Sequence, residues 1–180
     1  MKILDVGCGL DPQGTHNCDV LVQCDAPNLI EVDGVHLPYP DNFFDKVVSH
    51  HVIEHLHYHP EIFFLELLRV TKHIVHLTMP HKLSRSAKSP THTLYFDTDF
   101  WHNLCRKHRL CYRLLLHYSF RSTDTFSFGM GIGKWFRWRG HRLPILTLPN
   151  IDLDVMVFKN GDYEKYISNR KALGLKDKFT

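Results

Sequence analysis

The residues that could carry chemistry begin near the start of the chain, where an apolar run ends in Asp5, Gly7 and Gly9. Glycine lets the backbone turn sharply and lets another group approach closely. In open α/β sheets, ligands bind beyond the carboxyl ends of the strands. The carboxylate of Asp5 can also accept hydrogen bonds from a cationic group. The sequence therefore predicts a strand over residues 2–6 that ends in the floor of a ligand site.

Acidic residues farther along the chain could complete this site, because an acid at a strand end can accept hydrogen bonds from the two hydroxyls of a ribose. Two positions compete for the end of the second strand: residues 15–20 end at Asp19, and residues 20–23 lead to Asp25. The third strand ends at Asp33, and a parallel strand must first return to the opposite edge of the sheet. About five residues of ~3.3 Å each remain after Asp25, against about nine after Asp19. We therefore favour Asp19 and keep Asp25 as the alternative.

A second motif, LPYPDNFFDKVVSHHVIEHL, occupies residues 37–56 and strengthens the first. Together the two stretches resemble class I S-adenosylmethionine (SAM)-dependent methyltransferases, in particular the type 11 group. That group combines an Asp/Glu-x-Gly-x-Gly strand end with Asp-x-x-x-Leu-Pro-Phe-x-Asp-x-Ser-Phe-Asp and a strand that runs into His-x-x-Glu-His. The resemblance is specific over residues 2–80, loose to about residue 118 and weak beyond.

The resemblance implies an α/β fold with a Rossmann-like, seven-stranded, mostly parallel sheet and an antiparallel edge hairpin. Residues 110–120 and 151–158 would form the hairpin, and we expect helices over residues 60–70, 100–108 and 162–173. One departure is visible, because residues 10–14 are too few for a crossover helix, which needs a dozen or more residues. The first crossover helix should therefore be reduced or missing, within a single domain over residues 1–180.

The same resemblance implies S-adenosyl-L-methionine as the cofactor of this site. Asp5 would hold the methionine ammonium group, directly or through water. Asp19 or Asp25 would hold the ribose, and Asp33 the adenine amino group. The backbone around the two glycines would approach the methionine chain, and the end of the fourth strand would lie near the methyl group. The full set implied for the cofactor is Asp5, Gly7, Cys8, Gly9, Asp19, Asp25, Asp33, Gly34, Val35 and His50.

Histidine supplies the candidate bases, since methyl transfer to a hydroxyl needs a group that accepts its proton. His50, His51 and His92 are the candidates near the predicted methyl group. His51 and His55 are four residues apart, so on a helical turn they would share a face, which is also a spacing of metal ligands. The family that the sequence resembles has this motif without a metal. We therefore expect no metal and a structural or substrate-side role for this pair.

Composition adds only a few constraints on function. The formal net charge of +3 demands no nucleic acid partner, and the five cysteines show no Cys-x-x-Cys spacing. This spacing argues against a zinc ribbon or a disulfide framework and fits a reducing cytoplasm. No apolar run reaches the ~20 residues of a membrane span, and no signal peptide precedes the first strand. We therefore expect a cytoplasmic enzyme.

Residues 121–150 fit no standard element and are expected to be an insertion. They contain a basic and aromatic patch, KWFRWRGHR, at residues 134–142. This patch could hold an anionic substrate, RNA or a protein partner, or its arginines could simply pack over aromatic faces.

We favour a small molecule or glycan as the methyl acceptor. The alternatives are an RNA methyltransferase that uses this patch and a non-catalytic subunit. The missing helix would leave a sheet face uncovered, which favours a homodimer or a protein partner.

Overall fold

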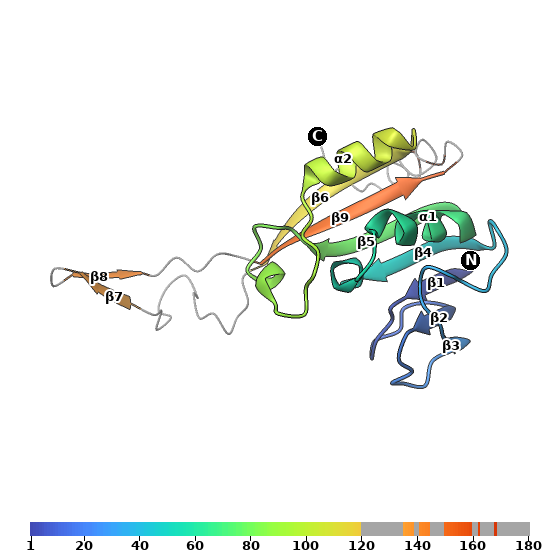
Figure 1. Ribbon diagram of the computed structural model, residues 1–180, viewed down its shortest axis with the longest axis horizontal. Coiled ribbons are helices and arrows are strands. Elements are labelled where there is room, and N and C mark those ends of the chain that lie inside the picture. Colours follow the sequence, from blue (N-terminus) through green and yellow to red (C-terminus); the bar gives the residue numbers. More distant parts are fainter. Residues whose placement is uncertain (120–134, 139–140, 145–149, 160–161, 163–167, 169–180) are drawn as a thin grey trace.

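Seven strands form one mixed sheet in the order β3-β2-β1-β4-β5-β9-β6. The computed structural model describes residues 1–119, 135–138, 141–144, 150–159, 162 and 168 (Figure 1). The strands β1 to β5 are parallel, whereas β9 runs antiparallel to both β5 and β6. This arrangement confirms the predicted fold class. The strand bounds are Ile3–Val6 (β1), His16–Asp19 (β2), Leu29–Glu31 (β3), Phe44–His50 (β4), Thr71–Pro80 (β5), Cys111–Ser119 (β6) and Asn150–Phe158 (β9).

Two helices, α1 (Pro60–Val70) and α2 (Thr98–Lys107), pack on one face of the sheet. Pro60 starts α1, where its missing N–H costs no hydrogen bond. The Asp97 side chain accepts a hydrogen bond from the Phe100 backbone N–H and caps α2. Two single 3-10 turns, η1 (Ile53–His55) and η2 (Ser86–Lys88), precede the helices. The core lies between this face and the helices and includes Val47, Val75, Leu77, Val155, Phe64, Leu67 and Trp101.

The first three connections between parallel strands contain no helix. Residues 7–15, 20–28 and 32–43 consist of turns, bends and extended backbone. The sequence predicted this for the first connection only. That connection is tight at Gly14, where an added Cβ would lie 2.2 Å from the His16 carbonyl oxygen and 2.9 Å from the Asp5 nitrogen. Only α1 and α2 are therefore long helices in the described part of the chain, and they cover a single face.

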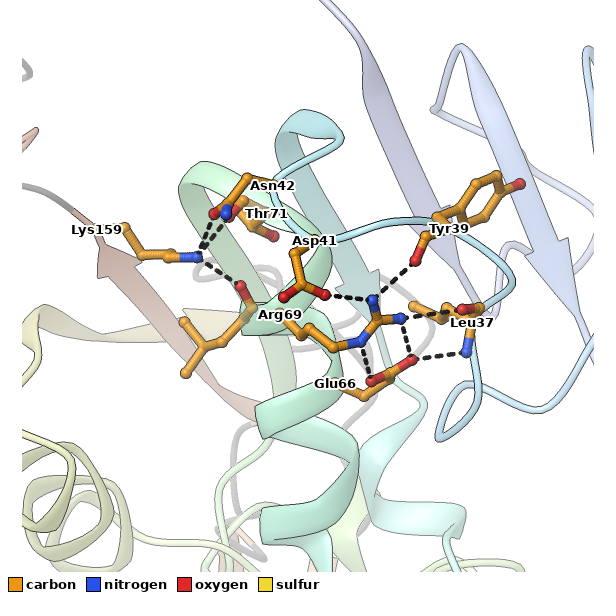
Figure 2. Close-up of polar contacts among 9 residues, drawn as sticks. Leu37, Tyr39, Asp41, Asn42, Glu66, Arg69, Thr71 and Lys159 are labelled. Carbon is orange, nitrogen blue, oxygen red and sulfur yellow. Dashed lines mark hydrogen bonds and ion pairs between the residues drawn. The ribbon is translucent and has the colours of Figure 1, made fainter.

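Arg69 of α1 holds the β3–β4 connection in place of a crossover helix (Figure 2). Its Nη1 donates to the Tyr39 carbonyl oxygen and to Asp41 Oδ1, both at 2.8 Å, and its Nη2 donates to the Leu37 carbonyl oxygen at 3.0 Å. Glu66, one turn earlier, receives Arg69 Nε and Nη2 at 2.7 Å each. The planar guanidinium thus bridges the helix and the proline-containing loop, a task that suits arginine.

Lys159, which directly follows β9, fixes the end of the same connection (Figure 2). Its ammonium group donates to Asn42 Oδ1 at 2.8 Å, to the Leu68 carbonyl oxygen at 2.9 Å and to the Thr71 carbonyl oxygen at 2.7 Å. Three acceptors match the three N–H donors of a lysine. The two cations together secure a segment that has no regular structure of its own.

The opposite face of the central sheet carries polar side chains. Strand register places His50 of β4 beside Thr78 of β5, and Thr78 beside Asp154 of β9. Thr78 Oγ1 donates to Asp154 Oδ1 at 2.7 Å, and His117 Nε2 lies 2.7 Å from Asp154 Oδ2. Within the described residues no helix covers this face, yet it is not the continuous apolar surface that a missing helix would be expected to expose.

The prediction that residues 121–150 contain no standard element is wrong in part. Residues Trp135–Trp138 (β7) and His141–Pro144 (β8) pair as a separate antiparallel ribbon. Apart from Asn150, which begins β9, the rest of this segment lies outside the described residues, as does the expected helix over residues 162–173 apart from residues 162 and 168. No helix in the part of the chain that the structure describes has the length and apolar character needed to cross a membrane.

Candidate functional site

A cavity of about 600 Å³ opens at the carboxyl ends of β1, β2 and β4. This volume falls in the range of about 300–1,000 Å³ that holds small molecules and cofactors. Val6 and Gly7 from the end of β1, Asp19 from the end of β2, and His51 just after β4 contribute to its wall. Because parallel strands present their carboxyl ends at one edge, segments far apart in sequence meet here.

The floor of this cavity is the glycine turn that follows β1. Gly7 and Gly9 adopt backbone φ values of +74° and +53°, which residues other than glycine rarely adopt. The Gly7 N–H donates to the Cys18 carbonyl oxygen at 2.8 Å, so the turn is tied to β2. A Cβ on Gly7 would lie 2.2 Å from Val52 Cγ2, whereas a Cβ on Gly9 would meet nothing within 4 Å. Gly7 therefore permits close packing, and Gly9 leaves space above the backbone.

Asp19 and Asp33 provide the two carboxylates of the cavity wall. Asp19 Oδ2 accepts the Gly9 N–H at 2.9 Å, and its Oδ1 accepts the Leu21 N–H at 3.1 Å. Asp33 Oδ1 accepts the Tyr58 hydroxyl at 3.0 Å. Burial, followed by this bond to Asp33, raises the pKa of Tyr58, so the phenol remains a donor. A carboxylate has about four acceptor sites, so each acid keeps capacity for the hydroxyls or amino group of a ligand.

Several predicted cofactor residues do not line the cavity, although Gly7, Gly9, Asp19, Asp33 and Gly34 do. Asp5 is 2% exposed, and its Oδ2 accepts the Gln13 N–H at 2.8 Å. Burial raises the pKa of the Asp5 carboxyl, and it raises the pKa of the buried Cys8 thiol to about 11. The predicted residues outside the lining are Asp5, Cys8, Asp25, Val35 and His50.

Of the three predicted bases, His51 alone lines the cavity. Its Nδ1 lies 3.3 Å from Oε1 of Glu54, which raises the pKa of His51 against the opposing effect of burial. His50 instead contacts Thr78 Oγ1 at 3.0 Å through Nδ1, and burial lowers its pKa. His92 packs its ring against His55, with ring centroids 4.6 Å apart.

The expected shared helix face of His51 and His55 is wrong. The 3-10 turn covers only Ile53–His55, and His51 precedes it with a φ of +55°. Both residues nevertheless line the cavity. The spacing of the two residues was therefore a poor guide to their relative orientation.

Glu54 and Tyr58 are functional candidates that were not predicted from the sequence. Glu54 stood inside the quoted His-x-x-Glu-His pattern, and it is 1% exposed beside His51. Tyr58 carries no signal in the sequence, because its contact with Asp33 joins two loops that are 25 residues apart. Only the folded chain reveals the pair of Tyr58 and Asp33.

Comparisons with known proteins agree with this geometry. Residues 4–78 match the family described as a methyltransferase domain, and no curated protein matches the chain by sequence. Among solved structures, a SAM-dependent methyltransferase from Archaeoglobus fulgidus is similar with 14% identity and a TM-score of 0.61, over 87% of this chain and 85% of that chain. One from Thermotoga maritima has 12% identity and a TM-score of 0.59, over 88% and 82%. At such identities the structural likeness shows the fold alone.

The residues at the cavity fit the cofactor that this family uses. Gly9 leaves open space over the turn, and Asp19 and Asp33 offer carboxylate acceptors on the adjoining wall. The matched segment, residues 4–78, contains both acids and the glycine turn. This chain is therefore similar to SAM-dependent methyltransferases, by a sequence match over residues 4–78, which is less than half of the chain, and by a shared fold.

Proposed function

We propose that the cavity binds SAM with its methionine part over the turn from Gly7 to Gly9, its ribose on Asp19 and its adenine beside Asp33. The observation that carries this proposal is that the turn and both acids line one cavity of about 600 Å³. When bound, SAM supplies an electrophilic methyl group on a sulfonium. The thioether that remains is a neutral leaving group, so its departure needs no acid. The protein then contributes mainly position and exclusion of water.

The remaining predicted cofactor residues have supporting roles in this proposal. Asp5 is buried against the Gln13 N–H, so its contact with the methionine ammonium group would pass through a water molecule. Cys8 and Val35 would contribute only through the backbone, since neither side chain lines the cavity. Asp25 is the weaker candidate for the ribose, because it lies outside the cavity wall whereas Asp19 forms part of it.

We further propose His51 as the base that accepts a proton from the methyl acceptor. It lines the cavity, and the buried carboxylate of Glu54 lies 3.3 Å from its Nδ1. A carboxylate at that nitrogen fixes the ring and stabilises the imidazolium that forms, so the other ring nitrogen is left to take the proton. The favoured acceptor is a small molecule or glycan hydroxyl, which would enter past the partly exposed His51.

Methyl-labelled SAM tests both the acceptor class and the base. We expect the label to appear in the low-molecular-mass or glycan fraction of a cell extract, and in neither RNA nor protein. His51→Asn should reduce this transfer by about 10²–10⁴-fold, the usual contribution of a general base. Calorimetry should show unchanged affinity of His51→Asn for SAM. Transfer that survives the substitution would remove His51 from the mechanism, and label in RNA would favour the alternative acceptor.

An exposed apolar patch at the rim of the cavity supports a second copy as the partner of this chain. Leu10, Val20, Leu21 and Val22 are 73%, 59%, 60% and 51% exposed, and they flank the hydrogen-bonded pair Gly9 and Asp19. Clustered apolar side chains of this kind often mark interaction sites, and two-fold dimers are the commonest oligomers. Light scattering should show a dimer that Leu21→Glu dissociates; a monomeric wild type would refute this.

Two other proposals concern partners and location. The side chains of residues 134–142 lie outside those described, so an RNA methyltransferase that uses this patch stays a prediction. RNA retention that falls steeply with salt would favour it.

All five cysteines are free, which fits our proposal of a reducing compartment, the cytoplasm. Localisation of the tagged chain in cells would test that assignment.

A further inference from the structure

Three side chains with metal-binding groups converge beside the cavity. Glu54 and His55 come from the turn η1, and His92 comes from the segment between η2 and α2. One ligand atom from each of the three lies within 4.8 Å of the other two. His55 also lines the cavity. The sequence had placed a metal, if any, on His51 and His55, so the contribution of His92 is new.

Two members of this cluster, which we call the Glu54–His55–His92 cluster, bury polar atoms that have no hydrogen-bond partner in the described structure. These are both carboxylate oxygens of Glu54 and the Nδ1 of His92. Glu54 is only 1% exposed, and His51 Nδ1 lies 3.3 Å from its Oε1. A buried carboxylate without hydrogen bonds is costly unless a cation compensates it. Because His51 faces one oxygen, the other is left to a different positive group.

The third member, His55, has its tautomer fixed by the backbone. Its Nδ1 lies 3.0 Å from the Thr91 carbonyl oxygen. A carbonyl oxygen only accepts, so Nδ1 carries the proton and Nε2 keeps a free lone pair. Metal-bound histidines almost always donate their other ring N–H to a carbonyl or carboxylate in this way. The arrangement therefore prepares Nε2 of His55 as a ligand atom.

Backbone hydrogen bonds already hold the two segments of the cluster together. The N–H groups of Thr93 and Leu94 donate to the Glu54 carbonyl oxygen at 2.8 and 3.1 Å. Thr93 Oγ1 donates to the Leu56 carbonyl oxygen at 2.6 Å. The ring planes of His55 and His92 meet at 78°. Ligands on segments that are fixed in this way lose little freedom when an ion binds.

We propose that Glu54, His55 and His92 bind a divalent transition-metal ion, with zinc the best match. Two imidazoles and one carboxylate are a donor set that zinc accepts with a fourth position left open. Magnesium and calcium prefer six or more oxygen ligands, which this cluster does not provide. Since His55 lines the cavity, the open position would face the ligand space. The inference does not depend on methyl transfer or on SAM binding.

Calorimetric titration of chelator-treated full-length protein with zinc chloride tests this inference. We expect one zinc ion per wild-type chain, an affinity at least about 100-fold weaker in His92→Ala and Glu54→Gln, and an unchanged affinity in the matched control His57→Ala. His57 belongs to the same histidine-rich segment but lies outside the cluster. Removing a direct ligand should weaken zinc binding at least as much as removing a group that hydrogen-bonds to a ligand. Removal of such a group typically lowers metal affinity by about 10–100-fold.

Thermal unfolding provides a second readout that does not depend on enzyme activity. Zinc should raise the melting temperature of wild type and of His57→Ala, because it binds the folded state. Zinc should not raise the melting temperature of Glu54→Gln, which lacks the carboxylate ligand. Equal zinc affinity in all variants, or several weak ions per chain, would mean an adventitious ion only and would overturn the proposal.

Discussion

Asp19→Ala should weaken the binding of SAM by about 100-fold. The carboxylate lies at the end of β2 in the cavity wall and would accept both ribose hydroxyls. Hydrogen bonds to a charged group contribute about 1.5–3 kcal/mol each, and about 1.4 kcal/mol corresponds to a tenfold change in affinity. Isothermal titration calorimetry with SAM measures the difference directly. Asp25→Ala is the matched control and should bind SAM like wild type.

The same pair of variants decides between the two acids that the sequence left open. Asp19 also accepts the Gly9 N–H, so its replacement could loosen the glycine turn. Circular dichroism and urea unfolding of Asp19→Ala would show whether the fold persists under the titration conditions. If Asp25→Ala loses affinity while Asp19→Ala keeps it, the assignment of the ribose site is wrong.

Arg69→Met should lower the free energy of unfolding by about 3 kcal/mol. The guanidinium joins α1 to the β3–β4 connection through Glu66, Asp41 and two backbone carbonyl oxygens. Removing one partner of a mostly buried, hydrogen-bonded ion pair typically costs about 3–5 kcal/mol, because the other charge is left unpaired. Urea denaturation of both proteins at neutral pH measures the loss.

The loss in Arg69→Met should depend on pH in a defined direction. The hydrogen bond from Arg69 outweighs burial and lowers the pKa of Glu66. A depressed carboxyl pKa stabilises the fold above the unfolded value of about 4.3, and this contribution disappears as the pH falls through the lower folded value. The stability difference between wild type and Arg69→Met should therefore shrink below about pH 4. A pH-independent difference would contradict the ion-pair account.

Two controls separate charge from geometry at Arg69. Arg69→Lys keeps the positive charge but cannot reproduce the flat array of donors, so it should recover only part of the stability. Asp41→Asn should have little effect, since the Asp41 side chain is 70% exposed and such pairs contribute little. Full recovery by lysine would show that charge alone matters here.

Much of the sheet could be predicted from the sequence, because its strands are short apolar runs that end in acids or glycines. Helix α1 begins and ends at the predicted residues, 60 and 70, where Pro60 starts it and Val70 leads directly into β5. The loss of helices from the second and third connections was not foreseen. The third connection is held by Arg69 and Lys159, whose contacts with it span 28 to 117 residues of sequence.

The candidate site was predictable where the motif itself forms the wall of the cavity. Gly7, Gly9 and Asp19 follow directly from strand ends and line the cavity. Asp5 is also at its strand position, but side chains alternate along a strand and its carboxylate turns to Gln13. The approach of His92 to Glu54 and His55 depends on how loops fold after the strands end. No local spacing rule reports such contacts.

A crystal structure grown with S-adenosylhomocysteine, the demethylated product, tests the central claim most directly. We expect density for the nucleoside in the cavity, with the ribose hydroxyls on the Asp19 carboxylate and the amino acid part over Gly7 and Gly9. A cavity that contains no ligand, or that is filled by the chain's own side chains, would contradict it.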